Sequence, residues 1–184
     1  MKDAVESYKR FLKGEESGLA EIIQAYKDGL IFYLNSYVRD LTLAEELTEE
    51  AFIKLVIKRP KFSERSGFKT WLYTIARNLA YDYLRHNKVK EISLEEIPEI
   101  CKEEADLEAL YIQQEKRILI HRAMKTLKAE YQQVLWLVYF EGFSHKEVAK
   151  IMEKTTHNVE MLVHRARQAL KTKLLKEGYV YEEL

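Results

Sequence analysis

The stretch FKTWLYTIARNLAYDYLR, from Phe68 to Arg85, combines two regular patterns on one expected helix. Its apolar residues recur at steps of three and four, as in the stripe by which an amphipathic helix packs on a core: Phe68, Leu72, Ile75, Leu79 and Tyr83. A second file takes every fourth residue and alternates cations with rings: Lys69, Tyr73, Arg77, Tyr81 and Arg85. With about 3.6 residues per turn this file drifts only about 40° per step, so its members share one side of the helix.

The second file has two interpretations. Tyrosines and basic residues can flank a core stripe and extend their polar ends into water. They can also form a nucleic-acid surface, in which cations hold phosphates and aromatic faces receive unstacked bases. The helix alone does not decide between the two.

The composition indicates an all-α protein. The chain has 184 residues, of which 47% are hydrophobic and 33% charged, so it can bury the core of one ordinary domain or of two small ones. Only six glycines and two prolines interrupt its long periodic segments. The lone cysteine, Cys101, excludes an internal disulfide and fits a reducing compartment. No apolar run approaches the roughly 20 residues of a membrane span, and the N-terminal residues lack the apolar core of a secretory signal. We therefore expect a cytoplasmic protein that does not insert into a membrane.

The zero net charge conceals an uneven distribution along the chain. Residues 1–90 hold 16 Lys and Arg against 13 Asp and Glu, residues 91–115 hold 1 against 9, and residues 116–184 hold 13 against 8. The acidic segment contains Pro98 and has weaker helical periodicity than its flanks. We interpret 91–113 as a linker between two small helical domains, at 1–90 and 114–184.

Four helices are expected in the first domain, at 2–13, 17–38, 42–58 and 67–88. Thr42 and Glu45 have the spacing of a capping box, which predicts the start of the third helix. Pro60 predicts its end, because the residue before a proline is pushed out of the α region. A polar loop, PKFSERSG, then leads to the helix that carries the cation and ring file.

Four shorter helices are expected in the second domain, at 115–127, 129–141, 144–152 and 155–176. Gly142 is placed to end one helix, and Ser144 with Glu147 forms a second capping box that starts the next. A short helix, the turn EKT and a longer helix with a polar outer side predict a helix-turn-helix. That outer side is either a DNA-reading surface or an ordinary solvated face. A metal site at His157, Glu160 and His164 is a weak alternative, since two turns separate the histidines.

No catalytic site is expected. The sequence has no glycine-rich phosphate loop, no H-E-x-x-H and no G-x-S-x-G. Cys101 lies among acidic residues, which disfavour its thiolate and weaken it as a nucleophile. We therefore expect a protein that is not an enzyme and that needs neither a metal nor a cofactor.

Three segments in register resemble one known family. They are LAEELTEEAF from Leu43 to Phe52, the stretch from Phe68 to Arg85, and LKAEYQQVLWLVYFEGFSHKEVAKIM continuing through VHRARQALK. Together they resemble the extracytoplasmic-function (ECF) class of bacterial sigma factors, the small subunits that give RNA polymerase its promoter choice. In the second segment the matching positions are Trp71, Leu72, Ile75, Ala76, Asn78, Asp82 and Arg85. The resemblance spans about residues 5–175.

The resemblance implies a role for each domain. The first would melt the minus-ten element and hold its non-template strand, with a pocket for one everted base between Phe62 and Gly67. The implied strand-binding residues are Phe62, Ser63, Arg65, Lys69, Tyr73, Arg77, Asn78, Tyr81, Arg85 and Lys88. The second would read the minus-thirty-five element from its last helix. The implied residues there are Thr156, His157, Asn158, Met161, His164, Arg165, Gln168 and Lys171.

The resemblance also implies partners. Core RNA polymerase would bind through the coiled coil of its largest subunit and the flap of its second-largest subunit, and an anti-sigma protein would hold the factor inactive. The implied docking residues are Glu45, Glu46, Glu49, Glu50 and Phe52. The start of the last helix departs from the family pattern, because Glu160 and Leu162 replace a lysine and an arginine. Its sequence preference is therefore open.

The sequence leaves two other functions open. The first is a helix-turn-helix regulator whose N-terminal half dimerises or senses a signal. The second is a helical interaction protein with no role on DNA. A duplex-binding regulator would have no use for the file from Lys69 to Arg85, and an interaction protein would leave both the file and the capped corner at Ser144 without a purpose.

Overall fold

The computed structural model describes residues 4–60, 67–87 and 120–176. Within them the protein is all-α and forms two small helical domains. The N-terminal domain contains α1 (Ala4–Leu12), α2 (Glu16–Val38), α3 (Leu41–Lys58) and α4 (Phe68–His86). The C-terminal domain contains a helical segment at 120–125, then α6 (Ala129–Leu135), the π-helix η1 (Trp136–Phe140), α7 (His145–Ile151) and α8 (Thr156–Lys176).

The helices of the N-terminal domain begin and end within two residues of the expected positions. One cap differs. The N-cap of α3 is Asp40, the residue just before the helix, whose Oδ1 accepts a hydrogen bond from the backbone N–H of Leu43 at 3.0 Å. The prediction of Thr42 as the cap was therefore wrong, because the carboxylate of Asp40 reaches the free N–H groups first and leaves Thr42 inside the first turn. The end of α3 at Lys58, two residues before Pro60, confirms the predicted stop.

The C-terminal domain contains the expected tight turn between η1 and α7, at Gly142 and Ser144. Gly142 adopts φ +69, a left-handed conformation that glycine takes at little cost. The Ser144 hydroxyl accepts a hydrogen bond from the N–H of Glu147 at 3.4 Å, and the Glu147 carboxylate accepts from the N–H of Ser144 at 2.9 Å, so the predicted capping box is confirmed. The expected helix at 129–141 is present too, although its second half, η1, is wound as a π-helix.

Replacing Ser144 by Ala should lower the free energy of unfolding by about 0.5–2 kcal/mol at neutral pH, because the first turn of α7 loses its cap. Urea denaturation followed by circular dichroism would measure it. Hydrogen bonding to Ser144 lowers the pKa of the Glu147 carboxyl. A carboxyl with a lowered folded-state pKa contributes stability above its unfolded pKa and loses it as the pH falls through the folded value. The difference in the free energy of unfolding between wild type and Ser144→Ala should therefore become smaller in acid. A difference that stays constant down to pH 2 would show that the charged Glu147 carboxylate does not contribute to the cap.

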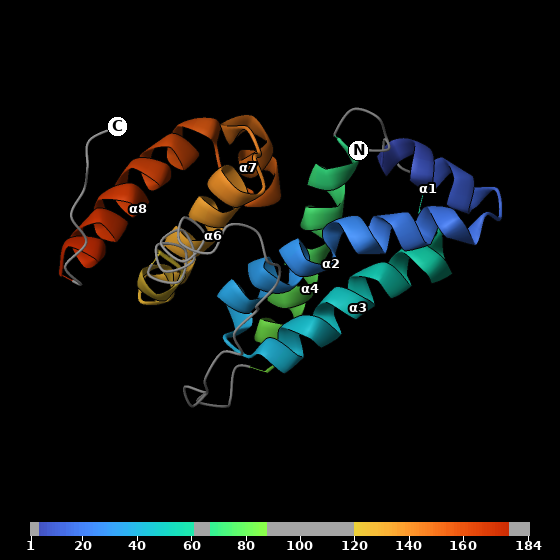
Figure 1. Ribbon diagram of the computed structural model, residues 1–184, viewed down its shortest axis with the longest axis horizontal. Coiled ribbons are helices and arrows are strands. Elements are labelled where there is room, and N and C mark those ends of the chain that lie inside the picture. The colour runs from blue at the N-terminus through green and yellow to red at the C-terminus, as the bar shows by residue number, and fades with distance from the viewer. Residues whose placement is uncertain (1–3, 61–66, 88–119, 177–184) are drawn as a thin grey trace, which may run out of the picture.

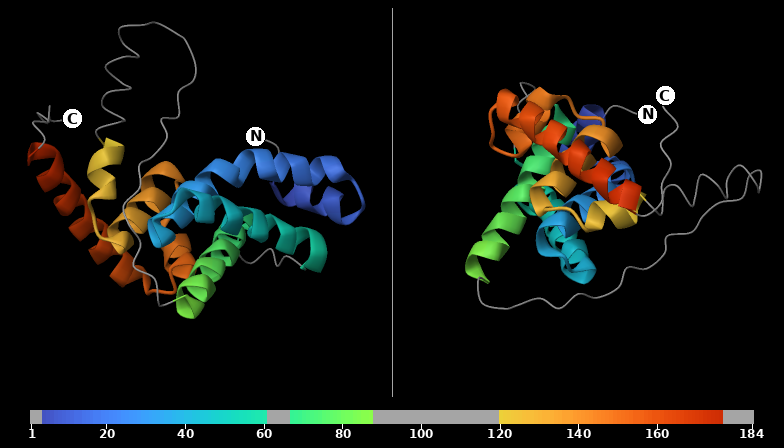
Figure 2. Two further views of the ribbon diagram at one scale, coloured as in Figure 1. Left: turned by 90° about the horizontal axis from the view of Figure 1, so that it is seen from below. Right: turned by 90° about the vertical axis from the view of Figure 1, so that its left-hand side faces the viewer.

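One continuous core runs through both domains. In the N-terminal domain the buried side chains include Tyr8, Leu30, Leu34, Leu55 and Leu72, and the C-terminal domain continues the cluster with Val134, Leu137, Ile151 and Val159. Figures 1 and 2 show the C-terminal helices grouped at one side of the N-terminal domain. Contacts of α6 with α2, and of α7 with α4, join the domains.

Several expectations fall on residues that the structure does not describe. The loop that precedes α4 lies outside the described residues except for Gly67, and so do the proposed linker at 91–113 and the start of the helix expected at 115. In the described parts of the chain, none of the helices combines the length and apolar character that crossing a membrane requires. The same parts contain no cluster of His, Cys, Asp or Glu that could hold a metal ion.

Candidate nucleic-acid and polymerase interfaces

The apolar stripe of α4 packs as the sequence predicts. Phe68, Leu72 and Leu79 are buried, while Ile75 and Tyr83 are half-buried against the core. Trp71 is half-buried and contacts the rings of Tyr8 and Phe68, with centroids 5.6 Å away in each case. Trp71 thus belongs to the packing of the N-terminal domain.

The cation and ring file of α4 is divided between two environments. Tyr73 is fully buried, with 0% of its surface exposed, Arg77 is 8% exposed, and Lys69 is half-buried. In contrast Tyr81 is 49% exposed, and Arg85 is exposed next to it, as is Asn78. The other residues implied for this surface lie outside the described residues: Phe62, Ser63, Arg65 and Lys88.

The buried half of the file is covered by the C-terminal domain. The Lys69 Nζ donates a hydrogen bond to the backbone oxygen of Glu141 at 2.6 Å and lies 2.7 Å from its carboxylate Oε2. The same ammonium sits 4.8 Å from the centre of the Phe143 ring. One cation of α4 is therefore held by the corner between η1 and α7.

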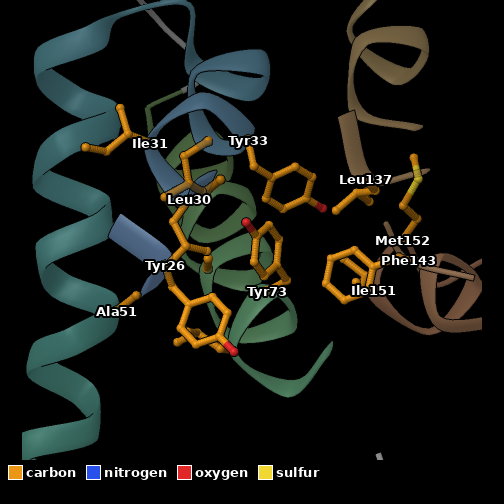
Figure 3. Packing of buried hydrophobic residues seen from close by; sticks show 14 of the residues in the cluster. Tyr26, Leu30, Ile31, Tyr33, Ala51, Tyr73, Leu137, Phe143, Ile151 and Met152 are labelled. Atoms are coloured by element: carbon orange, nitrogen blue, oxygen red, sulfur yellow. The ribbon is translucent and has the colours of Figure 1, made fainter. Parts of the chain in front are cut away.

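Tyr73 lies between the two domains. Its ring centroid is 5.3 Å from that of Tyr33 on α2 and 5.1 Å from that of Phe143. Figure 3 shows the three rings side by side. Burial, reinforced by the negative charge of Glu141, raises the pKa of the Tyr73 hydroxyl well above its ordinary value, so the group stays neutral. In this arrangement Tyr73 is inaccessible to a nucleic-acid base.

Arg77 connects the two halves of the file. Its Nη1 lies 2.7 Å from Oε1 of Glu153, in the turn between α7 and α8, and donates to Oδ1 of Asn78 at 3.3 Å. The guanidinium carbon also lies 4.4 Å from the centre of the Tyr81 ring, within cation–π range. Arg77 thus packs against the ring of the exposed Tyr81 and, through Glu153, also contacts the C-terminal domain.

The outer side of α8 is open. Its inner face buries Val159, Val163 and Ala166 in the core. All eight residues implied for DNA reading are exposed: Thr156, His157, Asn158, Met161, His164, Arg165, Gln168 and Lys171. Glu160 is exposed among them, so its charge would face any DNA that α8 meets. The structure brings this whole set onto one accessible surface.

The docking residues on α3 also divide into two groups. Glu45, Glu46, Glu49 and Glu50 are exposed, as expected for a contact surface. Phe52 is only 6% exposed and packs in the core, so it can support this surface but does not form part of it. Exposed apolar residues follow the acidic turns instead, namely Ile53, Val56 and Ile57, the last being 75% exposed. Sequence reasoning missed them, although the run IKLVIK carries more apolar residues than one core stripe needs.

Two family models match successive parts of the chain. Residues 22–89 match the family model described as Sigma-70 region 2, and residues 117–170 match that of Sigma-70, region 4. The curated relatives include the ECF sigma factor SigM of Bacillus subtilis, 32% identical over 152 residues that cover 82% of this chain and 91% of SigM. Sigma factor SigW of the same species is 27% identical over 175 residues, covering 90% of this chain and 94% of SigW.

Solved structures share the fold. CnrH, in complex with the cytosolic domain of CnrY, superposes with a TM-score of 0.64 at 17% identity, covering 96% of this chain and 99% of CnrH. The sigma factor RpoE, in complex with the anti-sigma factor NepR from Bartonella quintana, superposes with a TM-score of 0.65 at 23% identity. This match covers 84% of this chain and 95% of RpoE.

The chain belongs to the ECF family of RNA polymerase sigma factors. It is an alternative sigma factor, which binds RNA polymerase and directs promoter recognition in transcription initiation. Sigma factors are non-catalytic DNA-binding regulators. The alternative of a regulator with an N-terminal sensing domain is not favoured, because the N-terminal half matches a sigma-factor region.

Proposed function

We propose specific roles for the exposed surfaces of the two domains. The acidic turns of α3 dock on the coiled coil of the polymerase's largest subunit, with Ile53 and Ile57 extending the contact. The four exposed carboxylates beside exposed apolar side chains support this, because an interface needs both steering charge and buried apolar area. The C-terminal domain binds the flap of the second-largest subunit.

On DNA, we assign the strand-binding role to α4 and the duplex-reading role to α8. Tyr81 offers a half-exposed ring between Arg77 and Arg85, which suits a base that has left the stack. His164 and Arg165 lie on the exposed side of α8, which suits a major groove. The single observation that carries this assignment is the complete exposure of the outer side of α8 beside a buried inner face.

The proposal extends to domain limits, regulation and location. The domains comprise residues 1–90 and 114–184, with the acidic segment 91–113 as their linker. An anti-sigma protein holds the factor inactive, which is supported by two similar folds whose solved structures contain such a partner or a cytosolic partner domain. The factor acts in the cytoplasm.

In vitro transcription tests the function. Core RNA polymerase with and without this chain would be supplied with templates that carry random upstream sequences, and the enriched promoters would be sequenced. We expect transcripts only in the presence of the chain, from promoters that share two short elements. Transcripts that start equally well without the chain would contradict the proposed function.

A further inference from the structure

We propose that Glu160 is a base-reading residue of this factor and that it selects a cytosine in the minus-thirty-five element. This inference rests on the proposed role of α8 as the reader of duplex DNA. It names the base at one position of an element whose sequence is otherwise open.

Glu160 is the single acidic residue of a basic helix. Five cations share α8 with it, namely Arg165, Arg167, Lys171, Lys173 and Lys176. Phosphates attract those cations and repel a carboxylate, so a helix that only held the DNA backbone would bind better without Glu160. The carboxylate therefore needs a different explanation from the cations around it.

The fold does not explain the carboxylate. The Glu160 side chain is exposed, and within the described ranges it has neither an ion pair nor a hydrogen bond, although His164 follows one turn later. The helix dipole does not account for it either. The helix begins at Thr156 and has no acidic residue in its first turn, and the effect of the dipole fades beyond that turn. Glutamine, which forms helices about as well, would serve the fold equally.

The position of Glu160 along α8 directs it toward base edges. In a helix-turn-helix the N-terminal residues of the second helix contact the bases, and Glu160 is the fifth residue of α8. Arg167 is exposed on the same side of the helix, seven residues later, which is roughly 10 Å along the axis at about 1.5 Å per residue. The cation can thus hold a phosphate while the carboxylate reaches into the major groove. Figure 1 shows α8 along the side of the C-terminal domain that is turned away from α1 and α3.

Cytosine is the base that suits a lone carboxylate in the major groove. An ionised carboxylate only accepts hydrogen bonds. Guanine presents two acceptors there, and thymine presents an acceptor and a methyl group, so neither can pair with it. Adenine presents a donor with the N7 acceptor beside it, whereas cytosine presents its N4 amino group alone. Against any other base the carboxylate would lose water and gain no partner, which disfavours the wrong sequence.

The rival arrangement places Glu160 against a phosphate. It would weaken binding to every sequence alike and would carry no information about the bases. The two arrangements predict opposite results for substitution at this position. Contact with a base predicts a changed preference, and contact with a phosphate predicts a uniform gain in affinity.

The test uses holoenzyme assembled from core RNA polymerase and the full chain, with promoters whose upstream element is randomised. Promoters enriched by wild type should share a cytosine at one position of one strand. Glu160→Gln should prefer adenine there, because its amide pairs with N6 and N7 of adenine, and Glu160→Lys should prefer guanine. The preference should change by about tenfold or more in each variant, while the other positions keep theirs.

Glu16→Gln is the matched control. It removes one exposed carboxylate from α2, in the other domain, and so changes the net charge as Glu160→Gln does. This control should keep the wild-type preference at every position. Circular dichroism should show that all the variants are folded, because the exposed Glu160 side chain has no contact to lose.

A modified base tests the contact itself. N4-methylcytosine still pairs with guanine, but it carries a methyl group where the amino hydrogen faces the major groove. At the selected position of a synthetic promoter it should weaken binding of wild-type holoenzyme about tenfold, which corresponds to one lost hydrogen bond to a charged group. Holoenzyme with Glu160→Ala should bind the modified and unmodified promoters equally. A gel-shift assay at low temperature would measure both affinities.

The outcomes distinguish the contact from the proposed function. A cytosine that becomes adenine in Glu160→Gln establishes the contact. If wild-type promoters share an upstream element whose bases stay the same in Glu160→Gln, the contact is disproved and the role of α8 stands. A uniform gain in affinity for every promoter disproves it too, since the carboxylate then faces a phosphate. Wild-type promoters that share no upstream element would instead overturn the duplex-reading role of α8, and the inference with it.

Discussion

Reversing the charge at Glu46 and Glu50 should abolish transcription by this factor while leaving its fold intact. Both side chains are exposed on α3, and the contact found for them is a loose surface pair between Glu50 and Lys54 at 3.7 Å, which contributes little to stability. Across an interface, close charge pairs contribute on the order of 1.5 kcal/mol or more each, and reversal adds repulsion. We therefore expect Glu46→Lys with Glu50→Lys to reduce transcript yield by at least about 100-fold.

Gel filtration with core polymerase would locate the defect. The variant should elute separately from the polymerase, whereas wild type and the control Glu6→Lys with Glu16→Lys should co-elute with it. The control reverses two exposed charges on α1 and α2, so it shifts the net charge equally. Circular dichroism should give wild type and Glu46→Lys with Glu50→Lys the same melting curve. The control should melt slightly lower, because its two lysines stand in the first turns of α1 and α2, where positive charge opposes the helix dipole. Co-elution of a folded variant with unchanged affinity would show that the docking surface lies elsewhere.

The helices of both domains were predictable because local signals mark their ends. The capping box at Ser144, the left-handed Gly142 and the stop before Pro60 all act within a few residues of sequence, and the structure has each of them. The error at Thr42 has the same local origin, since Asp40 was an equally good cap two residues earlier. Local chemistry thus fixes where a helix begins, although two adjacent candidates can compete.

The burial of Tyr73 and Arg77 was not predictable from local pattern. Periodicity shows which residues share a side of α4, but not which part of a distant domain packs on that side. The contacts that bury them come from Phe143 and Glu153, some 70 residues later in the sequence. Two small residues, Ala76 and Ala80, flank the file and are fully buried, which is the available sign that another element approaches closely.

Phe52 shows a related limit. A helix with apolar residues on several sides does not reveal which of them face the core until its neighbours are known. In the structure Phe52 and Leu55 point inward, so Ile53 and Ile57 are left on the outer side. The sequence thus predicted an exposed acidic surface on α3, but it did not predict that Ile53 and Ile57 would be exposed beside it.

Burial also changes which substitutions can test strand opening. Tyr73→Ala would leave a cavity between the domains, at about 3–5 kcal/mol for a large aromatic residue, and would confuse folding with function. Tyr81 is the better probe, because it is half-exposed and its ring makes one edge-on contact with Tyr37 at 5.6 Å. Arg85, one turn after Tyr81, is also exposed and is the second suitable probe of strand opening.

Tyr81→Ala and Arg85→Ala should impair promoter melting more than closed-complex formation. A ring can replace stacking only after a base has left the duplex, and each such base is worth roughly 1–3 kcal/mol, or about 5- to 150-fold in the melting equilibrium. His164→Ala and Arg165→Ala should weaken the closed complex first, because α8 would engage intact duplex. Permanganate footprinting of unpaired thymines would measure melting, and a gel-shift assay at low temperature would measure the closed complex.

A template with a pre-melted bubble separates the two pairs of substitutions. The bubble removes the cost of unstacking, so the rate of initiation by Tyr81→Ala should recover in part, whereas His164→Ala should gain nothing because its duplex contact is still missing. Circular dichroism would confirm that each variant is folded. If Tyr81→Ala and Arg85→Ala melt promoters at the wild-type rate, the alternation of rings and cations along α4 serves packing, with Arg77 held beneath Tyr81 for that reason alone.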